Sequence, residues 1–470
     1  MIDSALHELP IRDAGAALRA GTFSATDLAR YSLDRIEKIN PGINAFVTIT
    51  PERALADAAR ADEDFARGID RGPLQGIPYG LKDIYDTAGI RTACHSRLRL
   101  NHVPEADSAV TEKFAAQGAV LLGKLTTNEF ALGNPDPQAP FPPALNPWNT
   151  ERSPGGSSSG SGAAVAAGLV RVAMGSDTGA SIRSPASLCG IVGLKPTFGL
   201  VSRRGVFPLS HSLDHCGPLT RSVEDAAIVM EAIAGYDHRD PASANAPVPQ
   251  FRSLMRGGVK GLRVGVPRHF FSGAKGLSPE TVIALEASLE KLANQGAIVR
   301  DITLPDYATM SACGRVIMYT EAFAIHEKDF RERPKEFGFS TYMRMIMGAF
   351  TSGADIVQAY RLRRELTQEV NSRFEDCDVI ITATALGTAP EMNQPDGWSM
   401  PSDAPMQCMP FNVTGHPAMA MPTGLSSDGL PLALQIVGKH FDEPTVLRVG
   451  AALEKDNPVL SRWPDIAKSG

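Results

Sequence analysis

Two turns dense in glycine and serine, close together in the sequence, constrain this chain more than any other feature. They lie at 155–162 and 175–184, and a run of small apolar residues at 163–173 connects them. Glycine adopts positive φ without steric cost and lets the backbone approach a substrate closely. A flexible Gly/Ser linker is the simpler interpretation, but a linker would not place Val165, Leu169 and Val170 at helical spacing. The pattern predicts two turns held apart by a helix.

The composition is that of an ordinary globular protein. The chain has 470 residues, 43% of them hydrophobic and 21% charged, and a net charge of −6. This length suits either several average domains or one elaborated α/β unit. The charge balance gives no reason to expect nucleic acid or an anionic membrane as a partner. The start of the chain does not resemble a signal peptide, and no run reaches the roughly 18 apolar residues of a membrane helix. We therefore expect a cytoplasmic protein.

Neither a metal nor a cofactor is expected. The six cysteines are scattered without a CxxC pair, so the sequence indicates no zinc site and no disulfide framework. Gly118 to Lys124 matches most of a phosphate-binding loop, but Leu125 stands where serine or threonine must bind magnesium. The stretch also closes a strand, whereas such a loop should open between a strand and a helix.

The periodicity outside the two turns alternates between helices and strands. Helices are expected at 4–67 with a break at Pro41-Gly42, and at 222–235, 278–295, 307–372 and 444–453. Strands are expected at 119–122, 191–194, 201–207, 261–267, 297–305, 378–384 and 431–438. The order of strand, helix and strand predicts an α/β sheet with helical crossovers.

Two short serine motifs point to other hydrolases. Gly156 to Gly160 fits the GxSxG of a nucleophile elbow, but no strand precedes it, as that motif requires. Ser288 to Lys291 fits the SxxK of serine acyl-enzymes, but it lies in a charged amphipathic helix. Both interpretations are therefore set aside.

Several blocks in order resemble the amidase signature family. They include GIPYGLKD, PGGSSSGS, GSDTGASIR, GLKPTFG, SLDHCGPLTRSVEDAA, GHPAMAMPTG and GLPLALQIVG, and they span nearly the whole chain. The resemblance implies an α/β fold in which a central mixed, twisted sheet is flanked by helices on both faces. It implies one domain over 1–470, with N-terminal helices at 1–67, a catalytic core at 70–240 and a variable helical segment at 305–372 lining the substrate pocket.

The resemblance also implies a Ser-Ser-Lys triad. Ser181 would be the nucleophile, Ser157 the bridging serine in a cis peptide with Gly156, and Lys82 the ultimate base. A lysine ordinarily titrates at about 10.4, so only desolvation or a nearby cation would leave it neutral at pH 7. All three residues are present, which argues against a non-catalytic relative.

By the same resemblance, the turn around the nucleophile supplies the oxyanion hole. Its donors would be the backbone amides of Thr178, Gly179, Ala180 and Ser181. Asp177 and Arg183 would hold the loop as structural partners. Family members often have glycine where this chain has Ala180, so the loop is less free in φ.

The predicted activity is cleavage of the C–N bond of small amides through an acyl-enzyme on Ser181, with water as second substrate. Esters, anilides and carbamates are further candidates, and specificity would come from loop 134–148 and the helices at 307–350. An apolar acyl or aryl group is favoured if the following residues line the pocket rather than fill the core: Met310, Met318, Met343, Met345, Met347 and Phe350.

The alternative is the glutaminase component of a tRNA-dependent amidotransferase, which releases ammonia for a partner protein. The resemblance to that component is more distant than the resemblance to bacterial stand-alone amidases. A block rich in arginine, tyrosine and glycine is typical of the glutaminase component, and it is absent from 318–338. We therefore favour a stand-alone hydrolase acting on a small molecule, and a homodimer is compatible with it.

Overall fold

A mixed sheet of eleven strands organises the computed structural model, which describes residues 6–136, 139–392 and 406–468. Two groups of parallel strands, β3-β2-β4 and β9-β7-β8, are joined by antiparallel strands. In spatial order the strands are β1 (Phe46–Ile49), β3 (Val120–Leu125), β2 (Pro78–Lys82), β4 (Val172–Asp177), β6 (His215–Thr220), β5 (Val192–Lys195), β10 (Ala418–Leu425), β11 (Pro431–Gly438), β9 (Val379–Ala383), β7 (Arg263–Val266) and β8 (Ile298–Asp301).

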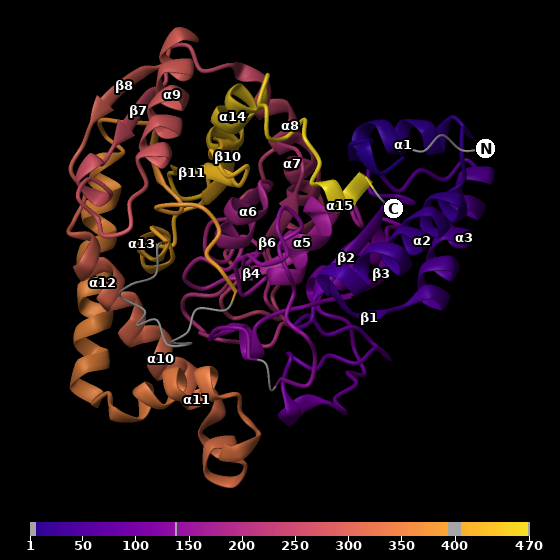
Figure 1. Ribbon diagram of the computed structural model, residues 1–470, viewed down its shortest axis with the longest axis horizontal. Coiled ribbons are helices and arrows are strands. Elements are labelled where there is room, and N and C mark those ends of the chain that lie inside the picture. Colours follow the sequence, from indigo (N-terminus) through magenta and orange to yellow (C-terminus); the bar gives the residue numbers. More distant parts are fainter. Residues whose placement is uncertain (1–5, 137–138, 393–405, 469–470) are drawn as a thin grey trace.

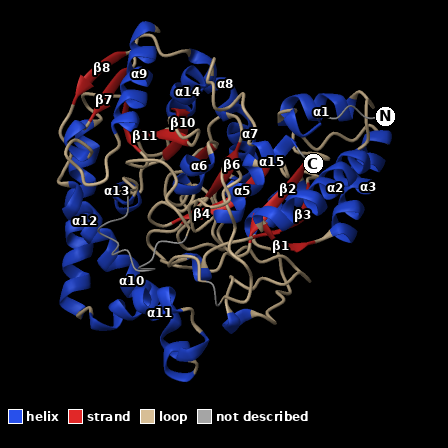
Figure 2. Ribbon diagram, viewed as in Figure 1, coloured by secondary structure: helices blue, strands red, loops and turns tan. Residues whose placement is uncertain are grey.

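Helices flank this sheet, as Figures 1 and 2 show. The first three lie beside β1, β2 and β3 at one end, and α10, α11 and α12 lie together on the opposite side of the molecule (Figure 1). The α/β class with a central mixed sheet is thereby confirmed. The helices are α1 (Ile11–Arg19), α2 (Ala25–Ile43), α3 (Pro51–Ala66), α4 (Ala109–Ala116), α5 (Ser159–Ala166), α6 (Arg183–Cys189), α7 (Val223–Ile233), α8 (Phe251–Leu254), α9 (Pro279–Asn294), α10 (Tyr307–Glu332), α11 (Phe339–Met345), α12 (Gly353–Arg373), α13 (Met409–Val413), α14 (Glu443–Glu454) and α15 (Asp465–Lys468).

Local sequence accounts for where several helices begin. The Ser24 hydroxyl accepts the Asp27 amide at the start of α2, and the Asp27 carboxylate accepts the Ser24 amide in return. The Ser222 hydroxyl likewise accepts the Asp225 amide at the start of α7, as predicted. Caps of this kind are worth about 1 kcal/mol each.

The helical predictions are wrong at two places. Pro41 and Gly42 lie inside α2, which continues to Ile43 because burial of Ile39 and Ile43 outweighs the hydrogen bond that proline removes. The helix expected at 163–173 is α5, which ends at Ala166. Gly168 follows with a φ of +66°, and strand β4 begins at Val172.

The strand predictions are also wrong in part. The stretch 201–207 forms two isolated bridges, Val201 to Ala234 and Val206 to Tyr85, in place of a strand. Strand β1 lies within the segment expected to be helical at 1–67, and β6 and β10 were not predicted. These strands depend on partners far away in the sequence, because β6 pairs with β4 and β5.

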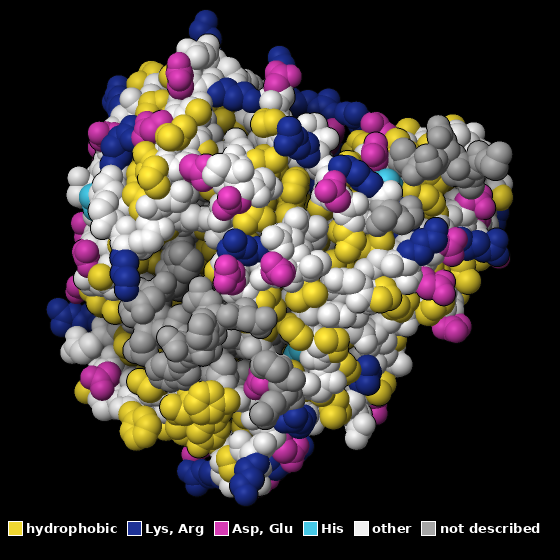
Figure 3. All heavy atoms as spheres, in the orientation of Figure 1, with side chains coloured by type: hydrophobic (Ala, Val, Ile, Leu, Met, Phe, Trp, Pro, Cys, Tyr) yellow, Lys and Arg dark blue, Asp and Glu magenta, His cyan; other side chains and the backbone are white. Residues whose placement is uncertain are grey.

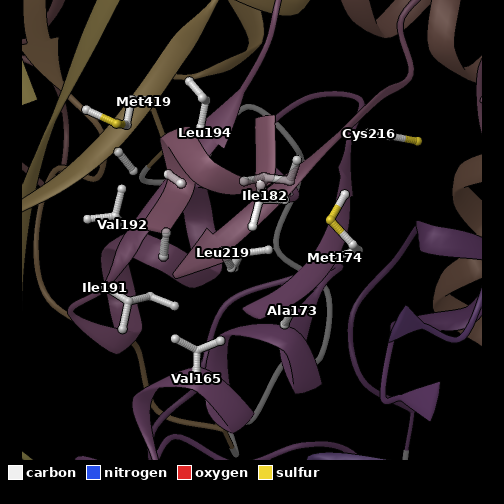
Figure 4. Packing of buried hydrophobic residues seen from close by; sticks show 14 of the residues in the cluster. Val165, Ala173, Met174, Ile182, Ile191, Val192, Leu194, Cys216, Leu219 and Met419 are labelled. Atoms are coloured by element: carbon white, nitrogen blue, oxygen red, sulfur yellow. The ribbon is translucent and has the colours of Figure 1, made fainter. Parts of the chain in front are cut away.

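Apolar side chains fill the space between the sheet and α5 and α6 (Figure 4). Those labelled in the figure are at most 1% exposed, and they come from the helices and strands that carry the two Gly/Ser turns. The layer therefore fixes the relative position of the two turns. Its members are Val165, Ala173, Met174, Ile182, Ile191, Val192, Leu194, Cys216, Leu219 and Met419.

The surface carries both signs of charge. Figure 3 shows Lys and Arg side chains interspersed with Asp and Glu over one face of the molecule. Within the described ranges, no helix combines the length and the apolar character needed to cross a membrane.

Candidate active site

The two Gly/Ser turns meet at the carboxyl ends of β2 and β4. These strands are parallel neighbours, so their carboxyl ends lie at the same edge of the sheet. Lys82 is the last residue of β2, and Ser176 lies near the end of β4. The Lys82 Nζ atom lies 2.7 Å from Ser157 Oγ and 2.9 Å from Ser176 Oγ. Lysine and bridging serine, distant in sequence, are in direct contact.

Glycine allows the turns to pack this closely. Gly155 has a φ of +79°, and a Cβ atom there would lie 2.8 Å from the Pro185 nitrogen, in the second turn. A Cβ atom at Gly160 would lie 2.3 Å from the Ala45 carbonyl oxygen. The Ser158 amide donates to the Ser181 carbonyl at 3.2 Å, and the Gly156–Ser157 peptide bond is cis, as expected.

Lys82 is fully buried, and burial lowers its pKa to about 7, although Asp214 and Asp177 oppose the shift. Desolvation, one of the two causes expected from the sequence, is therefore the cause that operates. Near neutral pH a large share of the lysine carries no proton. Such a Nζ atom can accept the proton of the Ser157 hydroxyl.

The turn from Thr178 to Ser181 leaves four backbone amides unpaired. In the part of the chain that the structure describes, these amides donate to no protein acceptor. All four residues line the pocket that also contains Ser157. Adjacent unpaired amides at a pocket wall are suited to bind a negatively charged oxygen.

A buried ion pair braces this turn from behind. Asp177 Oδ1 lies 2.9 Å from Arg183 Nη2, and both side chains are 0% exposed. The other carboxylate oxygen accepts the amides of Ile182 and Arg183 at 3.1 and 3.3 Å. Burial alone would raise the pKa of Asp177, but the Arg183 guanidinium outweighs it and holds that pKa well below its usual range. Asp177 is therefore ionised at any physiological pH.

Replacing Asp177 by asparagine should lower the free energy of unfolding by about 3–5 kcal/mol, because Arg183 would keep a buried charge without its partner. Chemical denaturation measures the change. Asp13→Ala, which breaks the exposed pair between Arg12 and Asp13, should change stability by less than about 1 kcal/mol. Equal small effects of both variants would contradict the bracing role.

Ser157 and Ser181 share a pocket of about 320 Å³. Its only charged lining side chains among the described residues are Arg315, from α10, and Arg344, from α11. Arg315 donates to Ser311 Oγ at 2.8 Å and Arg344 to Asn134 Oδ1 at 3.2 Å, and neither forms an ion pair with a described acidic residue. Burial lowers the pKa of Arg344. Other lining residues are Asn134, Pro135, Leu209, Tyr307, Ser311, Met318, Tyr319, Met406 and Met409.

The expected apolar lining is mostly wrong. Of the six predicted residues, Met318 alone lines the pocket in the described part of the chain. Met310 and Met345 are in the core, and Met347 and Phe350 are 53% and 81% exposed. Loop 134–148 contributes Asn134 and Pro135, while its residues 137 and 138 lie outside the described ranges.

Three polar side chains at the site were not predicted. Ser176 lies in the second Gly/Ser turn, so a hydroxyl on the strand next to Lys82 was a usable signal. Arg315 and Arg344 lie in helices whose residue pattern does not distinguish pocket from solvent. Only the packing of α10 and α11 brings them to the pocket.

Comparison with known proteins agrees with this geometry. A family model described as Amidase matches residues 27–447. The first subunit of the glutamyl-tRNA(Gln) amidotransferase of Roseiflexus sp. (strain RS-1) is 38% identical, covering 98% of this chain and 99% of that protein. A solved s-triazine catabolic enzyme, described with a vestigial protein complex, superposes with a TM-score of 0.90 at 35% identity, covering 95% of this chain and 98% of its own.

A third similar protein is the peptide amidase of Stenotrophomonas maltophilia. Its structure superposes with a TM-score of 0.86 at 30% identity, covering 98% of this chain and 99% of its own. The matches confirm the predicted family. Because the curated relative is part of an amidotransferase, they favour the alternative activity over the stand-alone hydrolase that the sequence led us to expect.

Proposed function

This chain belongs to the amidase signature family, and from that premise we propose that it hydrolyses a small amide through an acyl-enzyme on Ser181. One observation carries the proposal. A buried lysine whose pKa lies near neutrality contacts the Ser157 hydroxyl at 2.7 Å, in the wall of the pocket that Ser181 shares. Nucleophilic catalysis by serine requires a base of this kind.

The proposed reaction has two halves that use the same proton relay. Neutral Lys82 takes the Ser157 proton while Ser157 takes that of Ser181, whose Oγ attacks the amide carbon. The carbonyl oxygen becomes negative and is held by the free amides of the turn, each worth about 3 kcal/mol. The proton returns through Ser157 to the departing nitrogen, and the amine or ammonia leaves. Water then attacks the acyl group by the same route, which releases the carboxylic acid and restores Ser181.

We propose further that the substrate carries a carboxylate. Two guanidinium groups in one pocket, without a described acidic partner, favour a ligand that brings negative charge. An uncharged aryl amide would desolvate Arg344 without compensation. This replaces the apolar acyl or aryl group that the methionines suggested.

The side-chain amide of glutamine is the first candidate, with its α-carboxylate toward Arg315 and Arg344. The name of the Roseiflexus relative supports this choice, and a role within an amidotransferase would pass the ammonia to a partner. A stand-alone hydrolase of carboxylated amides that lack an amino group is the second candidate. It is favoured because no aspartate or glutamate among the described lining residues would pair with the α-ammonium of glutamine.

A substrate panel tests these proposals with the purified full chain. Ammonia release from glutamine and glutaramate should exceed release from uncharged valeramide by about 100-fold in kcat/KM. Faster cleavage of valeramide or 4-nitroacetanilide would contradict the carboxylate. Glutaramate cleaved far faster than glutamine would favour the second candidate, and the reverse order would favour the first.

Replacing Arg344 by methionine should raise KM for the carboxylated substrate by about 10- to 100-fold, because a charge-assisted hydrogen bond is lost. The kcat should change little, since the arginine is not among the groups that transfer protons. Valeramide hydrolysis should be unaffected. The exposed Arg361, which pairs with Glu365 on α12, provides the control variant Arg361→Met. A fall in kcat with KM unchanged would contradict a substrate-binding role.

A further inference from the structure

A buried asparagine far along the chain contacts the backbone of the oxyanion turn. Asn412, in α13, is 0% exposed. Its Nδ2 atom donates to the Asp177 carbonyl oxygen and to Asp177 Oδ1, each at 2.9 Å. Its Oδ1 atom accepts from Arg183 Nη2 at 2.6 Å. Every hydrogen bond of this side chain in the described structure therefore goes to the residues that flank the turn.

The bond to the Asp177 carbonyl matters because that carbonyl shares a peptide unit with the Thr178 amide. In a planar trans peptide the C=O and N–H bonds point in opposite directions. Asn412 holds the carbonyl on the buried side, where His215 Nδ1 also lies 3.1 Å away. The Thr178 N–H consequently faces the other side, toward the pocket that Thr178 lines.

The remaining contacts of the turn do not hold that peptide plane in the same way. The Thr178 hydroxyl donates to Asp214 Oδ1 at 2.6 Å, which restrains the side chain but not the amide. Arg183 binds the carboxylate of Asp177, not its carbonyl oxygen. Among the described side chains, Asn412 and His215 are the ones that contact the carbonyl.

The rest of α13 packs against the same turn. A Cβ atom at Gly179 would lie 2.8 Å from the terminal methyl of Met409. On its other side, α13 meets α10, where a Cβ atom at Gly314 would lie 2.8 Å from Val413 Cγ2. The helix is wedged between α10 and the turn, so Asn412 has little freedom to move away.

We infer that Asn412 is a positioning residue that orients the Asp177–Thr178 peptide so that its N–H points at the substrate carbonyl oxygen. The inference rests on the proposed acyl-enzyme function, since only a negative oxygen formed at Ser181 would use that amide. Asn412 touches no substrate. It acts through the Thr178 amide alone.

The test measures the rate at which a fluorophosphonate modifies Ser181, because this reaction also develops negative charge on an oxygen in the turn. Asn412→Ala should slow the modification by about 10- to 100-fold, somewhat less than complete loss of one oxyanion donor. For the amide substrate, kcat should fall by a similar factor while KM stays within about twofold. Intact mass confirms one adduct, and peptide mapping places it on Ser181.

Asn457→Ala is the matched control. Asn457 is also buried, its Nδ2 atom donates to the Pro422 carbonyl at 2.7 Å, and its Oδ1 atom accepts the Val459 amide at 3.0 Å. A merely structural role predicts that both variants lose stability and reactivity alike. The positioning role predicts that only the Asn412 variant loses reactivity at a temperature where both are folded. Asn412→Ser keeps a hydroxyl donor, should react at an intermediate rate, and replaces the alanine variant if that one does not fold.

The outcomes separate this inference from the proposed function. A modification rate of Asn412→Ala within threefold of wild type would overturn the positioning role, even if wild type hydrolyses amides. A wild-type chain whose Ser181 does not react with the fluorophosphonate would instead overturn the acyl-enzyme itself.

Discussion

Replacing Ser181 by alanine is expected to lower kcat for the amide substrate by on the order of 10⁴-fold or more, because the atom that forms the acyl bond is removed. Lys82 and Ser157 would keep their 2.7 Å contact, since neither depends on the Ser181 hydroxyl. The pocket and both arginines would also remain, so binding of the carboxylate product should persist. Ammonia release and product binding by calorimetry measure the two quantities.

Ser161→Ala is the control for this variant. Ser161 is buried in α5, between the two turns, and its hydroxyl donates to the Met174 carbonyl at 3.0 Å. Its removal should reduce stability slightly and leave turnover within about threefold. Wild-type enzyme should show a mass increase equal to the acyl group when rapidly quenched, and the Ser181 variant should not. Substantial turnover by Ser181→Ala would refute the assignment of the nucleophile.

Replacing Lys82 by methionine is expected to remove at least about 10³-fold of the activity at every pH between about 6 and 9. In the wild type, the pKa of this lysine is lowered to about 7 by burial. The base must be neutral to accept a proton, so kcat/KM should be low below this pKa and rise as pH increases through it. The variant has no titrating amine and should lose this rise together with the activity.

The pH profile of kcat/KM decides the role of Lys82. Retained activity with only a displaced pH optimum would show that another group is the base. Lys113→Met is the control, because Lys113 is a half-buried lysine whose ammonium donates to the carbonyls of Ile233 and Ala234 at 2.7 and 3.0 Å. Its loss should affect stability, while the pH profile should stay the same.

Elements with a strong local pattern could be predicted from the sequence. Helices α7 and α9 and strands β7, β9 and β11 lie within the predicted ranges or within one residue of them. Their periodicity and caps are properties of neighbouring residues. Strand β6 could not be found in this way, because Gly217 and Pro218 disfavour a strand locally and only pairing with β4 and β5 stabilises it.

The candidate site divides along the same line. Ordered motifs identified Lys82, Ser157 and Ser181 as residues that belong together, and the structure brings the first two into contact. The methionines were a misleading guide to the pocket, because composition does not say which face of a helix is covered. Arg315 and Arg344 could not be recognised, since their approach to Ser181 depends on how α10 and α11 pack against the sheet.

The sequence by itself determined the family, the α/β class and the chemical identities of the lysine and the two serines, because these are written in short motifs and local periodicity. Only the tertiary structure decided the properties that make the site work. It removes Lys82 from water and thereby lowers its pKa, it brings two arginines to the pocket, and it places Asn412 on the oxyanion turn. Desolvation and hydrogen bonding depend on atoms from segments hundreds of residues apart, which no local pattern specifies.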